Sequence, residues 1–503
     1  MMDQFLAAAA MLADPDLIVV IAISCFFGLF VGAVPGLTAT MATALLVPFT
    51  FFMEPLAAVS AIVACTAMAI TAGDIPGCLI RVPGTPASAA YTDETYAMTR
   101  KGLAAQALGS SLVSSVIGGL FGAVVLMLAA PALASVALGF SAFEYFWLAM
   151  IGLSCAAFVA SADPLRGILA LLIGLFVATV GMDSVSGAQR FTFGSTALTG
   201  GLSFVPAMIG LFAVAEILRA LLTGEARRPF AQPQQVQGVF HGVGRLMMRY
   251  WKNNLRGSIL GTAIGALPGA GGDIAAWMSY AMARKFSKTP EKFGTGHVEG
   301  VIEAGASNNA GLSGAWIPAL VFGIPGDAVT AIAVGVLIMQ GLNPGPRLFT
   351  TQAATLYAIY MVFILANLLL IPLGWMAIRM ARPILSVPRP QLMAAILLFC
   401  VVGSFAINNS MLDIGVMLGF GVVGLLLGRV GVPVAPVILG MVLGPLVEQN
   451  LLAAMVIADG RIMGFFERPV AAGLGVAAIL VWTLPVVFAL CRRRRVRMSA
   501  ASG

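Results

Sequence analysis

Long apolar segments separated by short polar stretches run through almost the whole chain. Segments of about 20 residues have the length that spans a bilayer as a helix, and a helix satisfies its own backbone hydrogen bonds in lipid. The apolar segments lie near residues 17–34, 56–73, 108–130, 145–160, 167–182, 202–222, 255–268, 328–342, 354–378, 392–407, 411–428, 432–447 and 470–490. This pattern predicts an all-α polytopic membrane protein with about 10 to 13 transmembrane or re-entrant helices.

Helix-breaking residues interrupt this pattern in two similar copies. The first copy joins residues 32–36 (GAVPG) to residues 75–84, and the second joins residues 265–269 (GALPG) to residues 317–326. The prolines pair as Pro35 with Pro268, Pro76 with Pro318, and Pro83 with Pro325. Proline removes a backbone donor and clashes with the preceding turn, so each break leaves backbone groups that lipid cannot satisfy. Matching breaks in two halves of a membrane chain point to a transporter's substrate site.

A polar and basic stretch separates the two copies and divides the chain. We expect an N-terminal membrane half at residues 1–222, a basic cytoplasmic loop at 223–256, a C-terminal membrane half at 257–491 and a basic cytoplasmic tail at 492–503. Each membrane half then contains one copy of the broken-helix pattern.

Charge placement predicts the orientation of the chain. The sequence is 60% hydrophobic and 10% charged, with a net charge of +7. Basic residues crowd 219–256, 284–292 and 492–497, whereas none precedes Arg81. The positive-inside rule therefore predicts a cytoplasmic C-terminus and an N-terminus outside.

The same rule predicts how the two copies are related. Residues 257–283 are flanked on both sides by basic clusters, so this segment should leave and re-enter the cytoplasmic side as a hairpin. Residues 17–53 are flanked by acids and should enter from the outside. The copies are therefore expected to form two inverted-topology repeats with Pro-Gly broken helices.

Polar and helix-breaking residues at these breaks are the candidate substrate ligands. They are Pro35, Gly36, Thr38, Pro83, Gly84, Thr85, Ser88, Pro268, Gly269, Asn308, Asn309, Pro325 and Gly326. Half-helix N-termini with nearby hydroxyl and amide groups favour an anion, because free amide donors and the helix dipole both attract negative charge. The alternative for Asn308 and Asn309 is a polar loop without a ligand.

Three acids, Asp74, Asp273 and Asp327, lie at the breaks, and a charge at membrane depth indicates function. Each could coordinate a coupling cation together with freed carbonyls. Each could equally cap the N-terminus of the next half-helix, and the two roles are compatible. Arg81 is the basic residue within a repeat motif, and it could pair with Asp74, reach a substrate carboxylate or extend to the membrane interface.

Enzyme chemistry is not expected. The two histidines, His241 and His297, have no neighbouring Cys or second His in the sequence, and the glycine clusters lack the Gly-Lys-Ser/Thr of a phosphate loop. We therefore predict no catalytic residue, no metal centre and no cofactor beyond a coupling Na⁺ or H⁺. The arginine-rich tail follows an apolar segment, as a topology anchor does, so no nucleic-acid partner is expected.

Several motifs together resemble one known family. They are Gly32–Leu37, Val82–Ala90, Met98–Gly102, Arg190–Gly194, Ile209–Glu216, Arg256–Ser258, Leu267–Gly271, Asn308-Asn309 and Gly323–Gly326. Over residues 16–440 they resemble the large permease subunit of the tripartite tricarboxylate transporters, the TctA-like family. The resemblance implies a bacterial inner-membrane secondary transporter that imports carboxylates by a cation gradient. It also implies two partners, a periplasmic solute-binding protein and a small membrane subunit of about four helices.

The chain departs from the family pattern at three places. The family often has Gly-Gly-Ser-Ile where residues 72–75 read Ala-Gly-Asp-Ile, and Asp-Gly-Tyr-Pro-Met where residues 94–98 read Glu-Thr-Tyr-Ala-Met. Its Pro-Gly-Ser reads Pro-Gly-Asp at residues 325–327. Two of these changes put an acid beside the expected site, and added negative charge repels a tricarboxylate unless a cation offsets it.

The sequence thus favours the large membrane subunit of a binding-protein-dependent carboxylate importer. The first alternative is a passive solute or ion channel, in which the same breaks line a continuous pore. The second is a non-transporting membrane scaffold or a membrane-embedded enzyme. The substrate and the coupling ion are not fixed by these patterns.

Overall fold

The computed structural model describes residues 2–159, 163–183, 187–223, 236–385 and 387–483. The predicted tail at 492–503 and residues 224–235 of the predicted basic loop lie outside this described part. The chain forms two compact units, residues 1–138 with 202–434 (unit 1) and residues 139–201 with 435–503 (unit 2). Each unit takes residues from both predicted halves, so the compact units do not follow the repeat boundaries.

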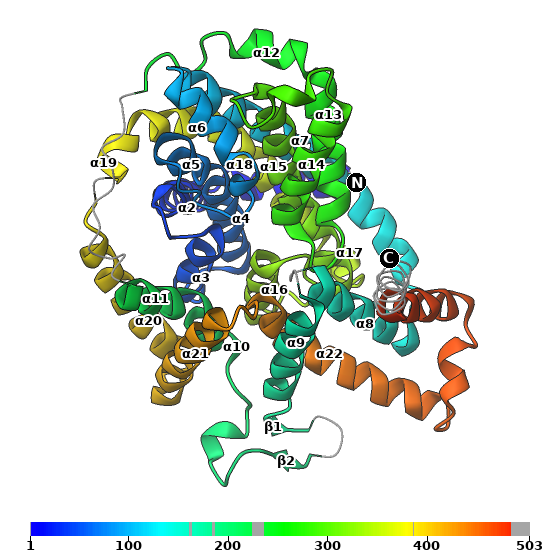
Figure 1. The fold of residues 1–503 in the computed structure, drawn as a ribbon. Coiled ribbons are helices and arrows are strands. Elements are labelled where there is room, and N and C mark those ends of the chain that lie inside the picture. The colour runs from blue at the N-terminus through cyan, green and yellow to red at the C-terminus, as the bar shows by residue number, and fades with distance from the viewer. Residues whose placement is uncertain (1, 160–162, 184–186, 224–235, 386, 484–503) are drawn as a thin grey trace, which may run out of the picture. The chain divides into compact units, whose positions relative to one another are not determined.

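Unit 1 contains both broken-helix copies (Figure 1). Its first part comprises α1 (Met2–Leu12), α2 (Pro15–Ala33), α3 (Ala39–Thr50), α4 (Pro55–Ala72), α5 (Asp74–Ile80), the short η1 (Ser88–Ala90), α6 (Thr92–Arg100) and α7 (Ala104–Ala137). Its second part comprises α10 (Phe204–Ile209), η3 (Gly210–Val214), α11 (Ala215–Thr223), α12 (Val243–Arg249), α13 (Trp251–Gly265), α14 (Gly271–Phe286), η5 (Pro290–Lys292), α15 (Val298–Phe322), α16 (Ala328–Met339), α17 (Leu348–Thr351), α18 (Ala353–Arg379), α19 (Ala381–Leu385), α20 (Arg389–Asn408) and α21 (Met411–Arg429).

Unit 2 is a smaller helical unit. It contains α8 (Ala142–Val159), α9 (Pro164–Ala178), η2 (Thr196–Leu198), α22 (Ala435–Ile457), η6 (Ile462–Phe466), and the antiparallel ribbon of β1 (Gly181–Met182) and β2 (Gln189–Arg190). α22 packs on α8 and α9. Arg190 donates to both carboxylate oxygens of Glu448 at 2.5 and 3.1 Å, which ties the ribbon to α22.

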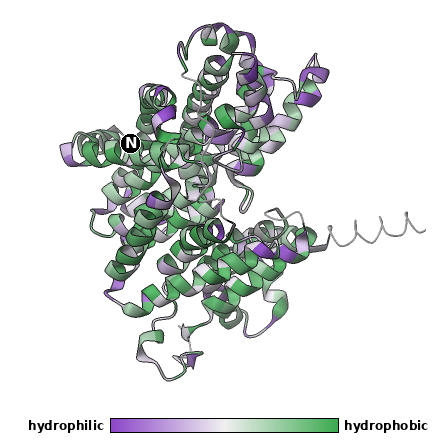
Figure 2. Cartoon of the chain, turned by 60° about the vertical axis from the view of Figure 1, so that its left-hand side comes forward, coloured by the Kyte–Doolittle hydropathy of each residue, from purple (hydrophilic) through white to green (hydrophobic). Residues whose placement is uncertain are grey.

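The prediction of an all-α polytopic membrane protein is confirmed. Among the described residues, eight helices are long and apolar enough to cross a membrane. Figure 2 shows apolar residues along most helices and hydrophilic residues mainly at helix ends and connections. Large apolar side chains such as Leu128, Leu165 and Phe176 are exposed, as expected for surfaces that face lipid.

The two copies pack their helices through corresponding glycines. In the first, α2 crosses α4 so closely that a Cβ on Gly32 would overlap the carbonyl oxygen of Ala69. In the second, α13 crosses α15, and a Cβ on Gly265 would overlap the carbonyl oxygen of Gly311. Gly32 and Gly265 correspond when Pro35 is matched with Pro268. Small residues let helix backbones approach closely where apolar side chains gain little from leaving lipid.

The first break of each copy makes the same turn at its Pro-Gly pair. Gly36 and Gly269 have φ values of 90° and 81°, a backbone conformation that residues with a side chain rarely adopt. The next residue closes the turn in both, with Leu37 N to Val34 O and Ala270 N to Leu267 O at 3.1 Å. The turn releases the chain into α3 in the first copy and α14 in the second.

The second break is repeated as closely. Arg81 and Gly323 occupy corresponding left-handed positions, with φ values of 59° and 69°. A Cβ on Gly84 would lie 2.8 Å from Gly32 O, and one on Gly326 would lie 2.8 Å from Gly265 O. In each copy the second break therefore packs directly against the end of the helix that leads into the first break.

The copies run in opposite directions within unit 1. His297 N, at the start of α15, donates to Glu94 Oε2 at 2.7 Å, and Glu94 lies beyond the end of α4 and α5. Gln340 Nε2, beyond the end of α16, donates to Thr50 O at 2.6 Å, just before α4 begins. Since the end of each copy meets the start of the other, α4 and α15 are antiparallel.

Candidate functional site

Both copies contribute to one polar cavity inside unit 1. It encloses about 400 Å³ of empty space, its open mouth included. Its lining comes from the starts of α3, α14 and α16, from the break after α5, and from α4 and α15. The lining residues are Thr38, Ala39, Thr40, Ile70, Thr85, Pro86, Gly272, Asp273, Asn308, Leu312, Asp327 and Val329.

Most of this lining consists of corresponding positions of the two copies. The pairs are Ala39 with Gly272, Thr40 with Asp273, Ile70 with Leu312, and Thr85 with Asp327. Matched positions of the two copies therefore meet at one cavity. The chain thus builds one site from both repeats, as broken-helix transporters do.

Matched positions of the two copies make the same reciprocal pair of hydrogen bonds, which is a capping box of α16 in the second copy. In the second copy Thr330 N donates to Asp327 Oδ1, and Asp327 N donates to Thr330 Oγ1, both at 2.8 Å. In the first copy Ser88 N donates to Thr85 Oγ1, and Thr85 N donates to Ser88 Oγ, both at 3.1 Å. The capping role foreseen for Asp327 is present, and Ser88 supports Thr85.

Asp327 also joins two helix starts. Gly272 N–H at the start of α14 donates to the Asp327 carboxylate. The neighbouring Gly271 has φ 58°, and a Cβ there would lie 2.6 Å from the Asp327 Cβ. The positive ends of α14 and α16 therefore meet at one carboxylate, an arrangement that stabilises its charge.

Asp273 connects the second copy to the first. It lies in the first turn of α14, and its Oδ1 accepts a hydrogen bond of 3.1 Å from Ala87 N. Trp277 on the same helix donates from Nε1 to Pro86 O at 3.1 Å. Asp273 is exposed at the cavity, and Asp327 is close enough for the two carboxylates to repel each other.

Neutral polar groups complete the lining. Thr38 is the N-cap of α3 and accepts from Met41 N at 3.2 Å. Asn308 on α15 is only 2% exposed, and its amide interacts with the hydroxyl group of Tyr91, although its Nδ2 makes no hydrogen bond of good geometry within the described residues. A buried donor without a good hydrogen bond is unusual and indicates that a ligand or water completes it.

Other predicted substrate ligands lie outside the cavity lining. Pro35, Gly36, Pro83, Gly84, Pro268, Gly269, Pro325 and Gly326 form the breaks themselves and are not among the cavity-lining residues. Asn309 faces away from the cavity and donates from Nδ2 to Asn367 Oδ1 on α18 at 3.2 Å. The structure thus brings together Thr38, Thr85, Asn308, Asp273 and Asp327 from the sequence-based set.

Asp74 lies apart from the other two acids. It is 4% exposed and accepts from Tyr91 Oη at 2.7 Å and from Ser111 Oγ at 2.5 Å. It lines a separate, mainly apolar cavity of about 250 Å³ with Ser111. Pairing of Arg81 with Asp74 is wrong, because the left-handed turn at Arg81 leaves its side chain exposed, where it pairs with Asp93 at 2.9 Å.

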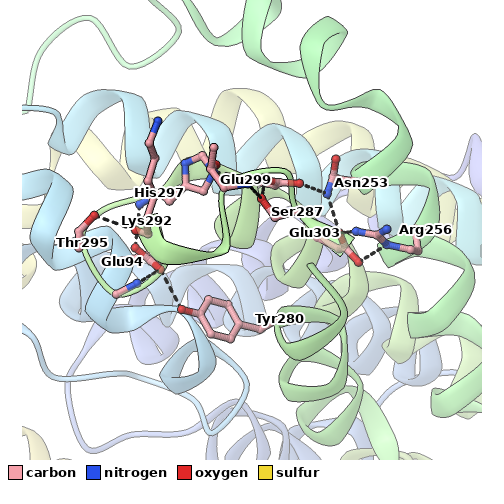
Figure 3. Close-up of polar contacts among 12 residues, drawn as sticks. Glu94, Asn253, Arg256, Tyr280, Ser287, Lys292, Thr295, His297, Glu299 and Glu303 are labelled. Atoms are coloured by element: carbon pink, nitrogen blue, oxygen red, sulfur yellow. Dashed lines mark hydrogen bonds and ion pairs between the residues drawn. The ribbon is translucent and has the colours of Figure 1, made fainter. Parts of the chain in front are cut away.

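A polar cluster that the sequence did not reveal joins the copies at one end (Figure 3). Glu94 is 0% exposed and accepts from Gly296 N and His297 N at 2.7 Å, from Tyr280 Oη at 2.8 Å and from Gly294 N. Its only sequence signal was its place in a family-like motif. Glu94 therefore fixes the loop between α14 and α15 against α6.

The same cluster continues along α13 and α15 (Figure 3). Arg256 donates to both oxygens of Glu303 at 2.6 and 2.5 Å, and Asn253 Nδ2 donates to Glu303 at 2.8 Å and to Glu299 at 2.9 Å. Glu303 is 0% exposed, so its charge needs these partners. The cluster ties the start of α15 to α13.

Broken helices whose starts meet at a polar cavity within a membrane bundle are typical of membrane transporters. The chain belongs to the tripartite tricarboxylate transporter TctA family, whose model matches residues 18–439. This agrees with the family resemblance seen in the sequence motifs.

Two relatives come from Agrobacterium vitis. The "Uncharacterized 52.8 kDa protein in TAR-I ttuC' 3'region" is 36% identical over 479 residues, which cover 92% of this chain and 93% of the relative. The "Uncharacterized protein in TAR-II ttuC' 3'region" is 38% identical over 230 residues, which cover 45% of this chain and 95% of the relative. No solved structure matches the chain.

Proposed function

We propose that this chain is the large membrane subunit of a tripartite importer that carries carboxylates across the bacterial inner membrane, driven by a gradient of Na⁺ or H⁺. Family membership supports the transporter class and the existence of partner subunits. The observation that carries the proposal is the cavity lined by matched positions of both copies, because a site shared by two oppositely directed repeats can be opened to either side by equivalent movements.

The cavity chemistry supports an anionic substrate. The start of α3 and the hydroxyl groups of Thr38 and Thr40 border it, and the buried amide of Asn308 adds a donor that makes no hydrogen bond of good geometry among the described residues. Helix starts and neutral donors favour carboxylates. A periplasmic solute-binding protein would deliver the substrate, and a small membrane subunit would complete the membrane part.

We propose that the end of unit 1 that holds the Glu94 cluster faces the cytoplasm. Lys101 and Arg256 bond within this end, and Arg284 and Lys285 lie in the last turn of α14. The positive-inside rule then places the N-terminus outside, because the first copy begins at the opposite end.

Uptake by the reconstituted complex tests the proposal. The chain, the small membrane subunit and the solute-binding protein are placed in liposomes, and labelled citrate, succinate and related acids are supplied with a Na⁺ gradient, a pH gradient or neither. We expect accumulation of one acid above its external concentration only with a gradient and the binding protein. Equilibration without accumulation would identify a passive channel, and no carboxylate flux would remove the proposed function.

Cysteine labelling tests the orientation. Phe52 follows α3 and Lys288 follows α14, at corresponding ends of the two copies, and both are exposed. In a chain whose native cysteines are replaced, Phe52→Cys should react with an impermeant maleimide from outside and Lys288→Cys from the cytoplasm. Labelling of both from the same side would contradict the inverted arrangement in the membrane.

A further inference from the structure

The two halves of the cavity are built from corresponding breaks but differ in charge. At two matched positions the first copy supplies a hydroxyl group, Thr40 and Thr85, and the second supplies a carboxylate, Asp273 and Asp327. A single symmetric ligand would not require this division. The cavity therefore has one side suited to an anion and one suited to a cation.

The contacts of the two cavity acids separate their roles. Asp327 accepts from Thr330 N and Oγ1, both at 2.8 Å, and from Gly272 N–H, so its charge is compensated by helix starts. Among the described residues, Asp273 accepts one hydrogen bond, from Ala87 N, and its carboxylate is exposed at the cavity. Asp273 is the acid with coordinating capacity left for a ligand.

The opposite side offers donors. The Thr38 hydroxyl already accepts from Met41 N, so its own O–H remains to donate. Thr40 lies beside it at the start of α3, and the buried amide of Asn308 lines the same cavity, with no hydrogen bond of good geometry at its Nδ2 among the described residues. The buried amide of Asn308 lies on α15 and is separate from the start of α3. Both features favour a carboxylate as the ligand on this side of the cavity.

We propose that the cavity binds two ligands side by side: a monovalent cation, Na⁺ or H⁺, at Asp273 and a substrate carboxylate at Thr38, Thr40 and Asn308. This proposal rests on the proposed function and adds the order in which the two ligands bind. Until Asp273 is neutralised, its charge repels a carboxylate bound in the same cavity. The cation therefore binds first, and by linkage the bound carboxylate tightens cation binding by the same factor.

Binding to the purified full-length chain tests this proposal without transport. Labelled ²²Na⁺ and labelled citrate and succinate are the probes, with one arm that varies Na⁺ at fixed pH and one that varies pH without Na⁺. In the wild-type chain we expect cation to raise carboxylate affinity about tenfold or more. The arm that shows the rise identifies Na⁺ or H⁺ as the cation.

Asp273→Asn mimics a neutralised acid. We expect it to bind carboxylate without added cation and to lose ²²Na⁺ binding if Na⁺ is the ligand. The double variant Thr40→Asp with Asp273→Thr moves the acid to the matched position and should restore cation dependence. Undiminished cation dependence in Asp273→Asn would overturn the proposal, as would loss of carboxylate binding in a chain that remains monodisperse and melts like the wild type.

Asp327→Thr is the matched comparison, because it introduces the residue that the first copy has and keeps a capping oxygen. It should change cation dependence less than about threefold, against about tenfold or more for Asp273→Asn. Loss of cation dependence in Asp327→Thr alone would assign the cation to Asp327 and contradict the proposal. If no carboxylate binds or is imported by the wild type while ²²Na⁺ binding depends on Asp273, the proposed function fails for these substrates but the cation site stands.

Discussion

The two repeats of unit 1 share their close helix crossings and their turns and differ in side-chain charge. Gly32 and Gly265 make the same close crossing, and Gly36 and Gly269 make the same left-handed turn. The reciprocal hydrogen bonds at Thr85 and Asp327 have the same pattern, although one uses a hydroxyl and the other a carboxylate. Glycine and proline thus determine the path of the chain, and the cap position can change its charge without altering that path.

The repeats also differ in how their ends are held. Glu94 accepts four hydrogen bonds from the α14–α15 loop and Tyr280, so one end of the interface is anchored by a buried charge. At the opposite end Gln340 donates a single neutral bond to Thr50 O. The difference indicates that the two ends resist separation unequally, the condition under which one end of a transporter opens more readily.

The shared crossings predict matched losses when the crossing glycines are enlarged. Gly32→Val and Gly265→Val should each destabilise the fold by more than about 3 kcal/mol, because the added side chain meets a backbone carbonyl that cannot move alone. The expected result is little monodisperse protein after purification in detergent, measured by size-exclusion chromatography.

Gly428→Val is the control for these variants. Gly428 lies in α21, is exposed, and a Cβ there would meet no atom within 4 Å. It should leave yield and melting temperature close to those of the wild type. If Gly265→Val is purified like the wild type while Gly32→Val yields little monodisperse protein, the two crossings are not equivalent.

Because the two ends are held unequally, Glu94→Gln should lower the stability of the fold substantially. The amide retains one acceptor oxygen but places an N–H₂ group against backbone donors, so several buried N–H groups lose their partner. A loss of about 2–3 kcal/mol is expected, the range for hydrogen bonds to a charged group. Thermal unfolding of the purified chain measures it, with exposed Glu291→Gln as a control that should shift stability by less than about 0.5 kcal/mol.

The equivalence of these hydrogen-bond pairs predicts a graded series at Asp327. Asp327→Ala removes the acceptor of Thr330 N and should cost about 1–2 kcal/mol. Asp327→Thr restores the group found at Thr85 and should recover most of that loss. Equal destabilisation by Ala and Thr would mean that the carboxylate charge, and not the cap, stabilises the start of α16.

The breaks and their meeting point could be predicted because their signals are local and occur twice. Pro35, Pro76 and their partners mark backbone that lipid cannot satisfy, and matching the copies groups Thr38, Asp273 and Asp327 at one place. A position next to a break in the sequence was enough to identify these residues, because the starts of the broken helices line the cavity.

The rest depended on contacts between distant residues. Asp74 lies two residues before Pro76 in the sequence. Because α4 continues almost directly into α5, the side chain of Asp74 points toward Ser111 on α7 and not into the cavity at the breaks. Glu94 finds its donors 186 to 203 residues along the chain, and no periodicity marks such a pairing. Arg81 points outward because of its left-handed backbone, which proximity to Asp74 in the sequence does not reveal.

The weaker end of the interface gives the smallest predicted effect. Gln340→Leu removes the donor to Thr50 O but retains similar volume, so the expected loss is about 1 kcal/mol, the usual net value of a neutral hydrogen bond. If this end opens during transport, weakening its closed form should also raise the reactivity of Thr40→Cys toward an impermeant maleimide added from outside, at little cost in melting temperature. The same reagent added from the cytoplasmic side should react with Thr40→Cys at an unchanged rate, because the Glu94 contacts are intact. A loss of stability as large as that caused by Glu94→Gln would show that the two ends are held equally. The ends would then differ only in the charge of the side chain that holds them.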